Sequence, residues 1–417
     1  MGHAAAMTHE TPQNVAVIGA GMVGLATAWF LQEHGVKVTV LDRTGIAAGS
    51  SWGNAGWLTP GLATPLPEPA VLKYGIRAVV SPSSPVYVPI TTNRRLLSFL
   101  VRFARNSTMP RWREAMAALV PINSLALSAF DTLKDGGVSE PTVAADSFIA
   151  AYRTTEEREV LLEEIEHIRA SGQPLEFDVL TGDEARSVEP SLSPAIGAAI
   201  RLHDQRFITP SLYVDSLAEA VRQRGARIIS GVRVSSVKDR GHVVSVAGED
   251  YDAAVIASGA WLNDLAGPFG VKLPVQAGRG YSFTVPIDPV PRGPVYFPAQ
   301  RVACTPAGDR LRIAGMMEFR PADAGLDTRR IEAIVNEARP LLLGAELGSR
   351  RDEWVGARPC TPDGLPVIGP TKSPRVYVAG GHGMWGVTLG PATGQLLAER
   401  MVTGRLPVQL RPFDPLR

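Results

Sequence analysis

The sequence predicts an α/β protein in which a doubly wound parallel sheet is interleaved with a second, α+β unit built on a mixed, mainly antiparallel sheet. Two observations carry this prediction. Residues 14–43 read as strand, glycine-rich turn, helix and second strand in one piece, and apolar runs with strand character return between helical segments later in the chain. A length of 417 residues exceeds one ordinary domain, so two domains are expected.

The first segment has the spacing of a phosphate-binding turn. A short apolar strand precedes Gly19, Gly21 and Gly24, which follow the G-x-G-x-x-G pattern. The first glycine allows a tight turn, the second lets the backbone approach a pyrophosphate, and the third lets the next helix pack closely on the sheet. We expect Met22 and Val23, at the start of that helix, to present backbone N–H groups to the phosphates.

The second strand of this segment ends in an acidic residue. Gly35 ends the helix, residues 37–41 form the strand, and Asp42 and Arg43 follow. A carboxylate at this place accepts a hydrogen bond from a ribose hydroxyl. Chance alone can produce the glycine spacing in a glycine-rich chain, but the strand, the helix and the acid together predict a dinucleotide site.

Composition excludes several classes of function. A net charge of +1 provides no basic field for nucleic acid, which is not expected as a partner. Cys304 and Cys360 are too few for a disulfide framework or a zinc site, so we expect no metal and a reducing compartment. Because no apolar run reaches about 18 residues, no transmembrane segment is expected. The expected location is cytoplasmic, with peripheral association at the inner face of the membrane left open.

A long loop follows the first segment. Residues 46–69 are rich in Gly, Ser, Pro and Trp and show little periodicity. A loop of this kind must be held by something, and we expect a cofactor to hold it. The expected contacts are Ser50, Ser51, Gly53, Asn54, Ala55 and Gly56.

The remaining elements alternate between helix and strand. Helical periodicity covers residues 96–134, 155–169, 209–224 and 329–343. Strand-like runs cover 227–229, 232–237, 243–246 and 253–257, and the runs 271–285, 295–297 and 310–314 are assigned to the second sheet.

Two later segments indicate which dinucleotide is bound. Residues 251–261 form a buried strand that ends in Ser258 and Gly259, small enough to pass close to a cofactor, and Val232 is a further expected contact. Residues 375–394 repeat the order strand, glycine-rich turn and helix, without an acid for a ribose. A helix N-terminus stabilises the negative charge of a reduced flavin ring, whereas nicotinamide has no such need. The flavin contacts expected in this turn are Gly381, His382, Gly383, Met384, Gly386, Val387 and Thr388.

Several motifs together resemble one family. They are Gly19-x-Gly21-x-x-Gly24, Gly53-Asn-Ala-Gly56, Gly278-Arg-Gly-Tyr281, Gly356-Ala-Arg-Pro-Cys-Thr-Pro-Asp-Gly364 and Gly380-Gly-His-Gly383. In this order, over almost the whole chain, they resemble the FAD-dependent D-amino-acid oxidase superfamily, above all its D-amino-acid dehydrogenase branch. The resemblance implies a Rossmann-like FAD-binding domain of the glutathione-reductase type and a substrate domain beneath the mixed sheet.

The two domains are expected to be interleaved. Residues 12–90, 200–265 and 350–417 are assigned to the FAD-binding domain, and residues 91–199 and 266–349 to the substrate domain. FAD is expected to be noncovalent. A covalent bond from Cys360 is the less favoured alternative, because a small buried thiol is the common state of a free cysteine.

Arg358 is the first candidate for binding a substrate carboxylate, because a guanidinium fork matches a carboxylate in bidentate geometry. The glycine-oxidase branch has a second arginine in the glycine-rich turn where this sequence has Met384, which implies a roomier, more apolar pocket. Arg279 and Tyr281 are the alternative substrate groups, since strand alternation sends both to one face. A solvent-exposed arginine and a core tyrosine fit the same pattern.

Other residues near these motifs have two interpretations each. His382 either contacts the flavin or is a structural histidine bonded to backbone. Glu318 either contacts the flavin or an arginine of the site, or it is an ordinary carboxylate that is solvated or ion-paired. Trp57 and Trp385 either wall the pocket or belong to the core.

These assignments predict FAD-dependent oxidative deamination of D-amino acids, with hydride transfer from the α-carbon to flavin N5 and hydrolysis of the imino acid. Electrons are expected to pass to a quinone or another carrier, because no lysine falls inside the motifs assigned to the ring. Two alternatives stay open. One is a glycine/sarcosine- or D-proline-type amine oxidase that uses O2, and the other is a non-catalytic flavin-binding regulatory module.

Overall fold

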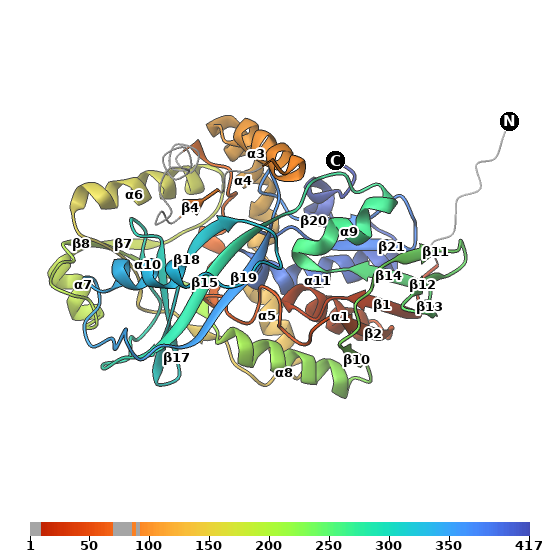
Figure 1. Ribbon diagram of the computed structural model, residues 1–417, viewed down its shortest axis with the longest axis horizontal. Coiled ribbons are helices and arrows are strands. Elements are labelled where there is room, and N and C mark those ends of the chain that lie inside the picture. Colours follow the sequence, from red (N-terminus) through yellow and green to blue (C-terminus); the bar gives the residue numbers. More distant parts are fainter. Residues whose placement is uncertain (1–9, 70–85, 89–91) are drawn as a thin grey trace.

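The computed structural model describes residues 10–69, 86–88 and 92–417 and contains two large sheets, which lie beside each other in Figure 1. The first has six strands in the order β10-β2-β1-β14-β21-β20, all parallel except β20 at one edge. The strands are β1 (Asn14–Ile18), β2 (Lys37–Asp42), β10 (Arg227–Ser230), β14 (Ala253–Ile256), β20 (Val367–Pro370) and β21 (Val376–Gly380). The predicted parallel sheet is confirmed.

Both faces of the first sheet are covered, which explains why its strands are almost wholly apolar. Val15 and Val17 of β1 pack into a core with the helices on one face, whereas Ala16 and Ile18 pack into a second core on the other. The first face is covered by α1 (Met22–Glu33), α5 (Ala126–Asp135), α8 (Pro210–Gln223) and α11 (Gly386–Thr403). The second is covered by α9 (Leu262–Ala266) and a small antiparallel sheet of β11 (Val237–Asp239), β12 (Val244–Val246) and β13 (Glu249–Tyr251).

The turn between β1 and α1 is packed too tightly for side chains. Gly19 has φ +120°, and a Cβ built on it would stand 2.4 Å from the Ala257 carbonyl oxygen. A Cβ on Gly24 would stand 2.0 Å from the Gly19 carbonyl oxygen. Both glycines therefore do what the sequence motif requires of them.

The second sheet has nine strands in the order β19-β15-β18-β17-β16-β6-β8-β7, with β4 paired to β18. Its pairs are antiparallel except β16 with β6 and β18 with β4, so the predicted mixed, mainly antiparallel sheet is confirmed. The strands are β4 (Val86–Tyr87), β6 (Phe148–Tyr152), β7 (Phe177–Thr181), β8 (Ala198–Leu202), β15 (Gln276–Pro286), β16 (Val295–Phe297), β17 (Val302–Ala307), β18 (Arg310–Phe319) and β19 (Arg351–Cys360).

Helices close the second sheet as well. Ile331 and Ile334 of α10 (Thr328–Ala338) share a core with Phe283 of β15, together with Ala185 of α7 (Gly182–Val188). On the other side, α6 (Thr155–Ala170) packs on β6 and β8. The other elements are α3 (Arg94–Asn106), α4 (Met109–Asn123), a small sheet of β3 (Trp57–Leu58), β5 (Val143–Ala144) and β9 (Arg206–Phe207), and the 3-10 helices η1 (Pro60–Leu62), η2 (Gly259–Trp261), η3 (Gly267–Phe269) and η4 (Val408–Phe413).

The structure differs from the expected elements in three places. The helical pattern over 96–134 is divided into three helices, α3 to α5, which are separated by Ser107 and Thr108 and by Ser124 and Leu125. The expected strand 232–237 begins only at Val237. Residues 351–360, expected in the FAD-binding part, form β19 of the second sheet, where they pair with β15. The domain boundaries as a whole stay a prediction.

One stretch of the described residues, Met109–Asp135, is long and apolar enough to cross a membrane by length and composition alone. It consists of α4 and α5 and contains Pro121 within α4. Leu119 and Phe130 are buried in the core that covers α1. In all, 44% of the apolar window is buried inside the protein.

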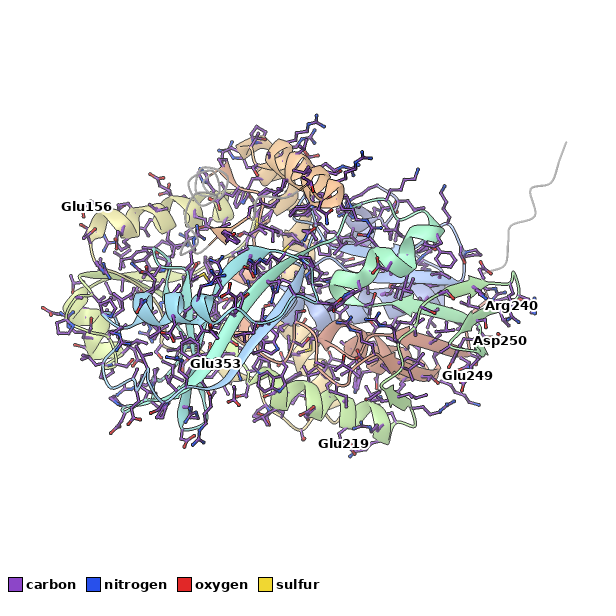
Figure 2. All side chains as sticks on the ribbon, in the orientation of Figure 1. Glu156, Glu219, Arg240, Glu249, Asp250 and Glu353 are labelled. Atoms are coloured by element: carbon purple, nitrogen blue, oxygen red, sulfur yellow. The ribbon has the colours of Figure 1, made fainter. Side chains whose placement is uncertain are left out.

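Charged side chains lie at the periphery of both halves. Figure 2 shows Glu156 at the start of α6, Glu219 on α8, and Arg240 and Asp250 at the far edge of the small antiparallel sheet. Arg240 and Asp250 form an exposed ion pair at 3.8 Å. Such pairs contribute at most about 1 kcal/mol.

Candidate active site

The first cavity, of about 450 Å³, lies at the carboxyl ends of the parallel strands of the first sheet. Its lining includes Gly19 after β1, Asp42 at the end of β2, Ser258 after β14 and Gly380 at the end of β21. Ligands of open parallel sheets bind at this edge. The first cavity is therefore where the fold places a dinucleotide.

The N-terminus of α1 borders the first cavity. Gly21 precedes the helix and provides no side-chain cap, while the backbone N–H of Met22 donates to Ser51 Oγ at 3.1 Å. A Cβ on Gly21 would stand 3.2 Å from that same oxygen, so the glycine keeps the 46–69 loop close to the turn. Ser50 and Ser51 both line the cavity. The helix terminus and two hydroxyls form a set of donors that suits a pyrophosphate.

Asp42 holds two turns at the adenosine end of the cavity. Its Oδ2 accepts from the Ala20 N–H at 2.9 Å, and its Oδ1 accepts from the N–H groups of Thr44 at 2.8 Å and Gly45 at 2.9 Å. A carboxylate offers roughly four acceptor sites, so these bonds leave one for a ribose hydroxyl. Asp42 therefore shapes the cavity as well as lining it.

Arg43 belongs to a group that the sequence did not reveal. Its guanidinium carbon lies 3.5 Å from the centre of the Trp261 ring, and its Nη2 lies 3.0 Å from Asp323 Oδ1. Trp261 Nε1 also donates to Asp323 at 3.2 Å. All three line the first cavity, but they come from distant segments, so no local motif identifies Trp261 and Asp323.

The polar groups of the first cavity fit FAD. Two buried lining atoms have no partner within the described chain, Ser258 Oγ and His382 Nδ1. Buried polar atoms are normally paired, so a ligand is expected to satisfy them. FAD carries hydroxyl, phosphate and ring heteroatoms along its length, and these can reach both ends of the cavity. His382 Nε2 lies 2.8 Å from Thr393 Oγ1, and burial lowers the pKa of the ring to about 4, so His382 is neutral at pH 7.

Most of the expected cofactor residues lie in this lining. They are Gly19, Gly21, Met22, Val23, Gly24, Asp42, Arg43, Ser50, Ser51, Asn54, Val232, Ser258, Gly259, His382, Gly386 and Val387. Ala55 and Met384 line a second cavity instead. Gly53, Gly56, Gly381, Gly383 and Thr388 are in neither lining. Gly53 is packed under Trp354, and the Thr388 hydroxyl donates to the Trp57 carbonyl oxygen at 2.9 Å.

The second cavity, of about 380 Å³, meets the first at Asn54, which lines both. Its walls are mainly apolar and include Trp57, Trp385 and Met384. The Trp57 indole N–H donates to Thr305 Oγ1 and the Trp385 indole N–H to the Thr64 carbonyl oxygen. The two tryptophans therefore wall the pocket, and Met384 contributes to its apolar character.

Arg358 lies in the wall of the second cavity. Its Nη1 donates to the Met316 carbonyl oxygen at 2.7 Å and lies 4.0 Å from Met317 Sδ. Burial lowers the pKa of this guanidinium. Among the described residues no carboxylate forms an ion pair with it, so the arginine presents an unneutralised charge to the cavity. A ligand carboxylate would supply the missing partner.

Arg279 and Tyr281 do not line either cavity, so the structure offers no support for them as substrate groups. Arg279 donates to Glu318 at 3.2 Å and to the carbonyl oxygens of Ala324 and Gly325. The Tyr281 hydroxyl donates to the same Glu318 oxygen at 2.7 Å. Alternation does send both side chains to one face, but that face packs against α10 and Glu318 and not against the cavity. Glu318 is accordingly ion-paired and buried.

Cys360 is buried and lines neither cavity. Burial raises the pKa of its thiol to about 12, so no thiolate is present near neutral pH. Because the thiolate is the reactive form, a covalent flavin bond from Cys360 is disfavoured.

A polar group in the second cavity was also missed from the sequence. Glu68, Glu164, Tyr296 and Arg301 line it together. They come from a loop, from α6, from β16 and from the turn after β16. Their separation in the chain gives no local signal. Burial, and next the charge of Glu68, raise the pKa of Glu164 to about 7, while Arg301 acts against this shift.

The fold and the two adjoining cavities define a dinucleotide-dependent oxidoreductase with a separate substrate pocket. The model of the family "FAD dependent oxidoreductase" (DAO) matches residues 14–400, and the chain belongs to this family. It is therefore an FAD-dependent enzyme, and the resemblance drawn from the motifs is confirmed.

Relatives and solved structures agree with this assignment. The chain is 28% identical over 411 residues to D-amino acid dehydrogenase of Agrobacterium fabrum, covering 94% of this chain and 96% of the relative. It is 29% identical over 409 residues to D-amino acid dehydrogenase of Azorhizobium caulinodans, with the same coverage. Glycine oxidase from Geobacillus kaustophilus has a similar fold, with a TM-score of 0.71, 24% identity, and coverage of 98% of this chain and 99% of the other.

Proposed function

We propose that this enzyme oxidises the α-amine of D-amino acids to the imino acid, which water then hydrolyses. The observation that carries the proposal is Arg358, a guanidinium without an acidic partner in the described chain, in an apolar cavity that adjoins the cofactor cavity. FAD supplies the two-electron acceptor for hydride from the α-carbon. The relatives that carry the name D-amino acid dehydrogenase support a D-configured substrate.

The protein mainly positions the substrate. Arg358 binds the carboxylate, and the walls around Met384 and Trp385 exclude water from the reacting carbon. Within the described part of the second cavity, the lining contains neither histidine nor lysine that could act as a base. The lining does contain the carboxyls of Glu68 and Glu164, and we propose that the amine binds in its neutral form without using them as a base. We expect kcat/KM to rise with pH toward the pKa of the substrate amine.

We further propose that the electrons pass to a quinone or a similar carrier. A cation close to the flavin favours the one-electron reduction of oxygen that starts peroxide formation. The lining of neither cavity contains a described lysine, and Lys73 lies outside the described residues. His382 is neutral, and the charge of Arg358 is engaged by the substrate carboxylate.

A membrane quinone would suit a cytoplasmic enzyme that docks on the inner face of the membrane. The net charge of +1 conceals an uneven distribution, because no acidic residue lies between Glu68 and Glu114. On α3, at the top edge of Figure 1, Arg94, Arg95, Arg102 and Arg105 are exposed beside the exposed apolar residues Leu97 and Val101. Basic residues with exposed apolar neighbours favour anionic lipid surfaces. Co-sedimentation with vesicles that contain anionic lipid, but not with neutral vesicles, is expected, and Arg102→Gln with Arg105→Gln should weaken it.

The volume of the second cavity bears on the alternatives. A cavity of about 380 Å³ is larger than glycine or sarcosine needs. This volume favours amino acids with a side chain larger than a hydrogen atom. A flavin-binding module without turnover would not need an unpaired guanidinium next to the cofactor cavity.

The test is anaerobic mixing of the purified flavoprotein with D- and L-amino acids, glycine, sarcosine and D-proline, while the flavin absorbance is followed. Fast bleaching by D-amino acids alone is the expected result. Bleaching only by glycine, sarcosine or an L-amino acid would contradict the proposal, and no bleaching by any amine would favour the non-catalytic alternative.

A further inference from the structure

The second cavity has two polar regions with different charge. One is Arg358, whose guanidinium bonds the Met316 carbonyl oxygen on β18. The other is the group of Glu68, Glu164, Tyr296 and Arg301, which we call the acidic subsite. The proposed reaction accounts for the first region and leaves the acidic subsite without a role.

The acidic subsite carries an excess of negative charge when all its groups are ionised. Two carboxylates face one guanidinium, because Arg301 interacts electrostatically with both Glu68 and Glu164 and also bonds Tyr296. Burial raises the pKa of Glu68, and burial with the charge of Glu68 raises that of Glu164. The Glu164 carboxyl, with a pKa of about 7, is therefore partly protonated near neutral pH. A second cation beside the carboxyls would lower their pKa values again, and the proton would be released.

A buried hydroxyl beside this subsite also lacks a partner. Tyr152 of β6 is 2% exposed, and its hydroxyl has no hydrogen bond within the described chain. Tyr296, Glu164 and Arg301 all influence its pKa electrostatically, which places the hydroxyl next to the subsite. An unsatisfied buried hydroxyl is costly unless a ligand or water pairs with it. Tyr152 itself is not part of the described cavity lining, so its hydroxyl is an unsatisfied polar group close to the subsite and does not face the cavity.

The backbone at Arg301 is held in a conformation that few side chains adopt. Arg301 has φ +57° in the turn between β16 and β17, and its carbonyl oxygen lies near Gly315 of β18. Non-glycine residues in this left-handed region concentrate at ligand sites, where the surrounding structure enforces them. Arg301 itself lines the second cavity.

The spacing of the two regions matches a long amino acid. Arg358 bonds β18, while Tyr296 lies on β16, two strands away in the sheet. Two strand spacings amount to about 10 Å. This distance suits a substrate that has a carboxylate at one end and a polar group at the end of an extended side chain of about four or five atoms.

We propose that the preferred substrates of this enzyme are D-amino acids whose side chain ends in a cation, an ammonium or a guanidinium, held by Glu68 and Glu164. The inference rests on the proposed oxidation of D-amino acids and adds its side-chain class. The Tyr296 hydroxyl, which also lines the cavity, accepts from the same cationic group. The positive charge of Arg301 offsets part of the negative charge of the two carboxylates. The subsite therefore binds one cationic group and not two.

The charged groups around Glu164 make a dependence on pH testable. Those that influence the subsite are Glu68, Arg301, Tyr296, Tyr152, His167 and Glu157. Because the pKa of Glu164 is raised to about 7, the carboxyl is protonated below that pH and binds a cation poorly. The preference for a cationic side chain should therefore strengthen as the pH rises from about 6 to about 8.

The experiment compares substrates of nearly equal shape that differ in charge. D-Arginine is measured against D-citrulline, and D-lysine against D-norleucine, as kcat/KM of the holoenzyme with an artificial acceptor. The expected preference for the cationic member of each pair is at least about tenfold. The Glu68→Gln and Glu164→Gln variants should each lose most of this preference, measured as the ratio of kcat/KM between the two members of a pair. Glu163→Gln is the control, because Glu163 is exposed and next to Glu164 on α6.

Three outcomes separate the hypotheses. Oxidation of D-norleucine and D-citrulline at rates equal to or above those of their cationic partners would overturn this inference and leave the proposed function standing. Preferences that survive in both Gln variants would place the cation elsewhere and also overturn it. Failure of every D-amino acid to reduce the flavin would overturn the proposed function and this inference together.

Discussion

The guanidinium of Arg358 lies across the backbone of Gly280, so closely that a Cβ on Gly280 would stand 2.2 Å from Arg358 Cζ. Gly280 lies in β15 and Arg358 in the neighbouring β19. The arginine reaches the Met316 carbonyl oxygen on β18 by crossing over β15 at a residue without a side chain. Gly280 thus makes room for the arginine of β19, whereas Gly278 makes room for the side chains of Met317 and Cys360.

The Gly280→Ala variant should therefore damage substrate binding without unfolding the protein. The new methyl group meets the flexible end of Arg358 and pushes the guanidinium aside. A displacement of about 1 Å can lower kcat/KM by about 100-fold. The measurement is kcat/KM with FAD content and Tm as folding checks. Gly348→Ala, at a position with open space around it, is the control. Normal kinetics in Gly280→Ala would mean that the position of Arg358 is unimportant.

The Arg358→Leu variant should lose the anchor for the substrate carboxylate and keep FAD. Removal of one partner of a desolvated, charge-assisted pair costs about 2–5 kcal/mol, measured as a fall in kcat/KM. Arg339→Leu is a matched exposed control. The carboxylate site lies elsewhere if Arg358→Leu retains wild-type kcat/KM for every amino acid that the enzyme oxidises.

The Arg279→Met variant should affect stability more than catalysis. Arg279 is buried, forms an ion pair with Glu318, and bonds two carbonyl oxygens. Breaking a buried pair from one side costs about 3–5 kcal/mol of the free energy of unfolding. Chemical denaturation measures this loss, and kcat/KM per folded, FAD-loaded molecule should change little. A large loss of kcat/KM at unchanged stability would return Arg279 to the active site.

The Asp42→Ala variant should release FAD. It removes the acceptor for the N–H groups of Ala20, Thr44 and Gly45 together with the bond expected to the ribose. One hydrogen bond to a charged acceptor contributes about 1.5–3 kcal/mol, so the Kd of FAD should rise by at least tenfold. Fluorescence of released flavin measures the Kd. Asp250→Ala, at the periphery in Figure 2, is the control and should bind FAD normally.

Reoxidation distinguishes a dehydrogenase from an oxidase. The flavin is reduced with a good D-amino acid without oxygen and then mixed with aerated buffer or with a soluble quinone. We expect slow reaction with oxygen and faster reaction with the quinone, because within the described chain neither cavity lining has a lysine. Rapid formation of stoichiometric peroxide, ahead of the quinone reaction, would identify an oxidase.

Sequence reasoning succeeded where the determinants are local. Gly19, Gly24 and Asp42 act on neighbours along the same strand–turn–helix unit, so their spacing alone predicts their roles. The prediction for Arg279 and Tyr281 on β15 was less successful, because the sequence of a strand does not show which of its two faces lines a cavity. The face of Arg279 and Tyr281 is decided by Glu318 on β18, which is distant in sequence.

The acidic subsite shows the same limit of local patterns more strongly. Among the described elements, three helices (α3, α4 and α5) and three strands (β4, β5 and β6) lie between Glu68 and Glu164, and no spacing relates the two residues. Only the closure of the second sheet brings the loop, α6 and the β16–β17 turn to one cavity. The membership of 351–360 in the second sheet is likewise set by pairing with β15, and not by the strand sequence itself.

The way the chain alternates between the two sheets has a consequence for protein engineering. The first sheet takes strands from residues 14–42, 227–256 and 367–380, and the second takes its strands from the stretches between and beside them. Any fragment that contains all strands of one sheet therefore also contains strands of the other, so a single cut in the gene cannot separate the two sheets. A truncated gene should yield neither a soluble flavin carrier nor an isolated substrate domain. The strands of the two sheets alternate in five blocks, so exchanging the whole set of one sheet between homologues takes four crossovers.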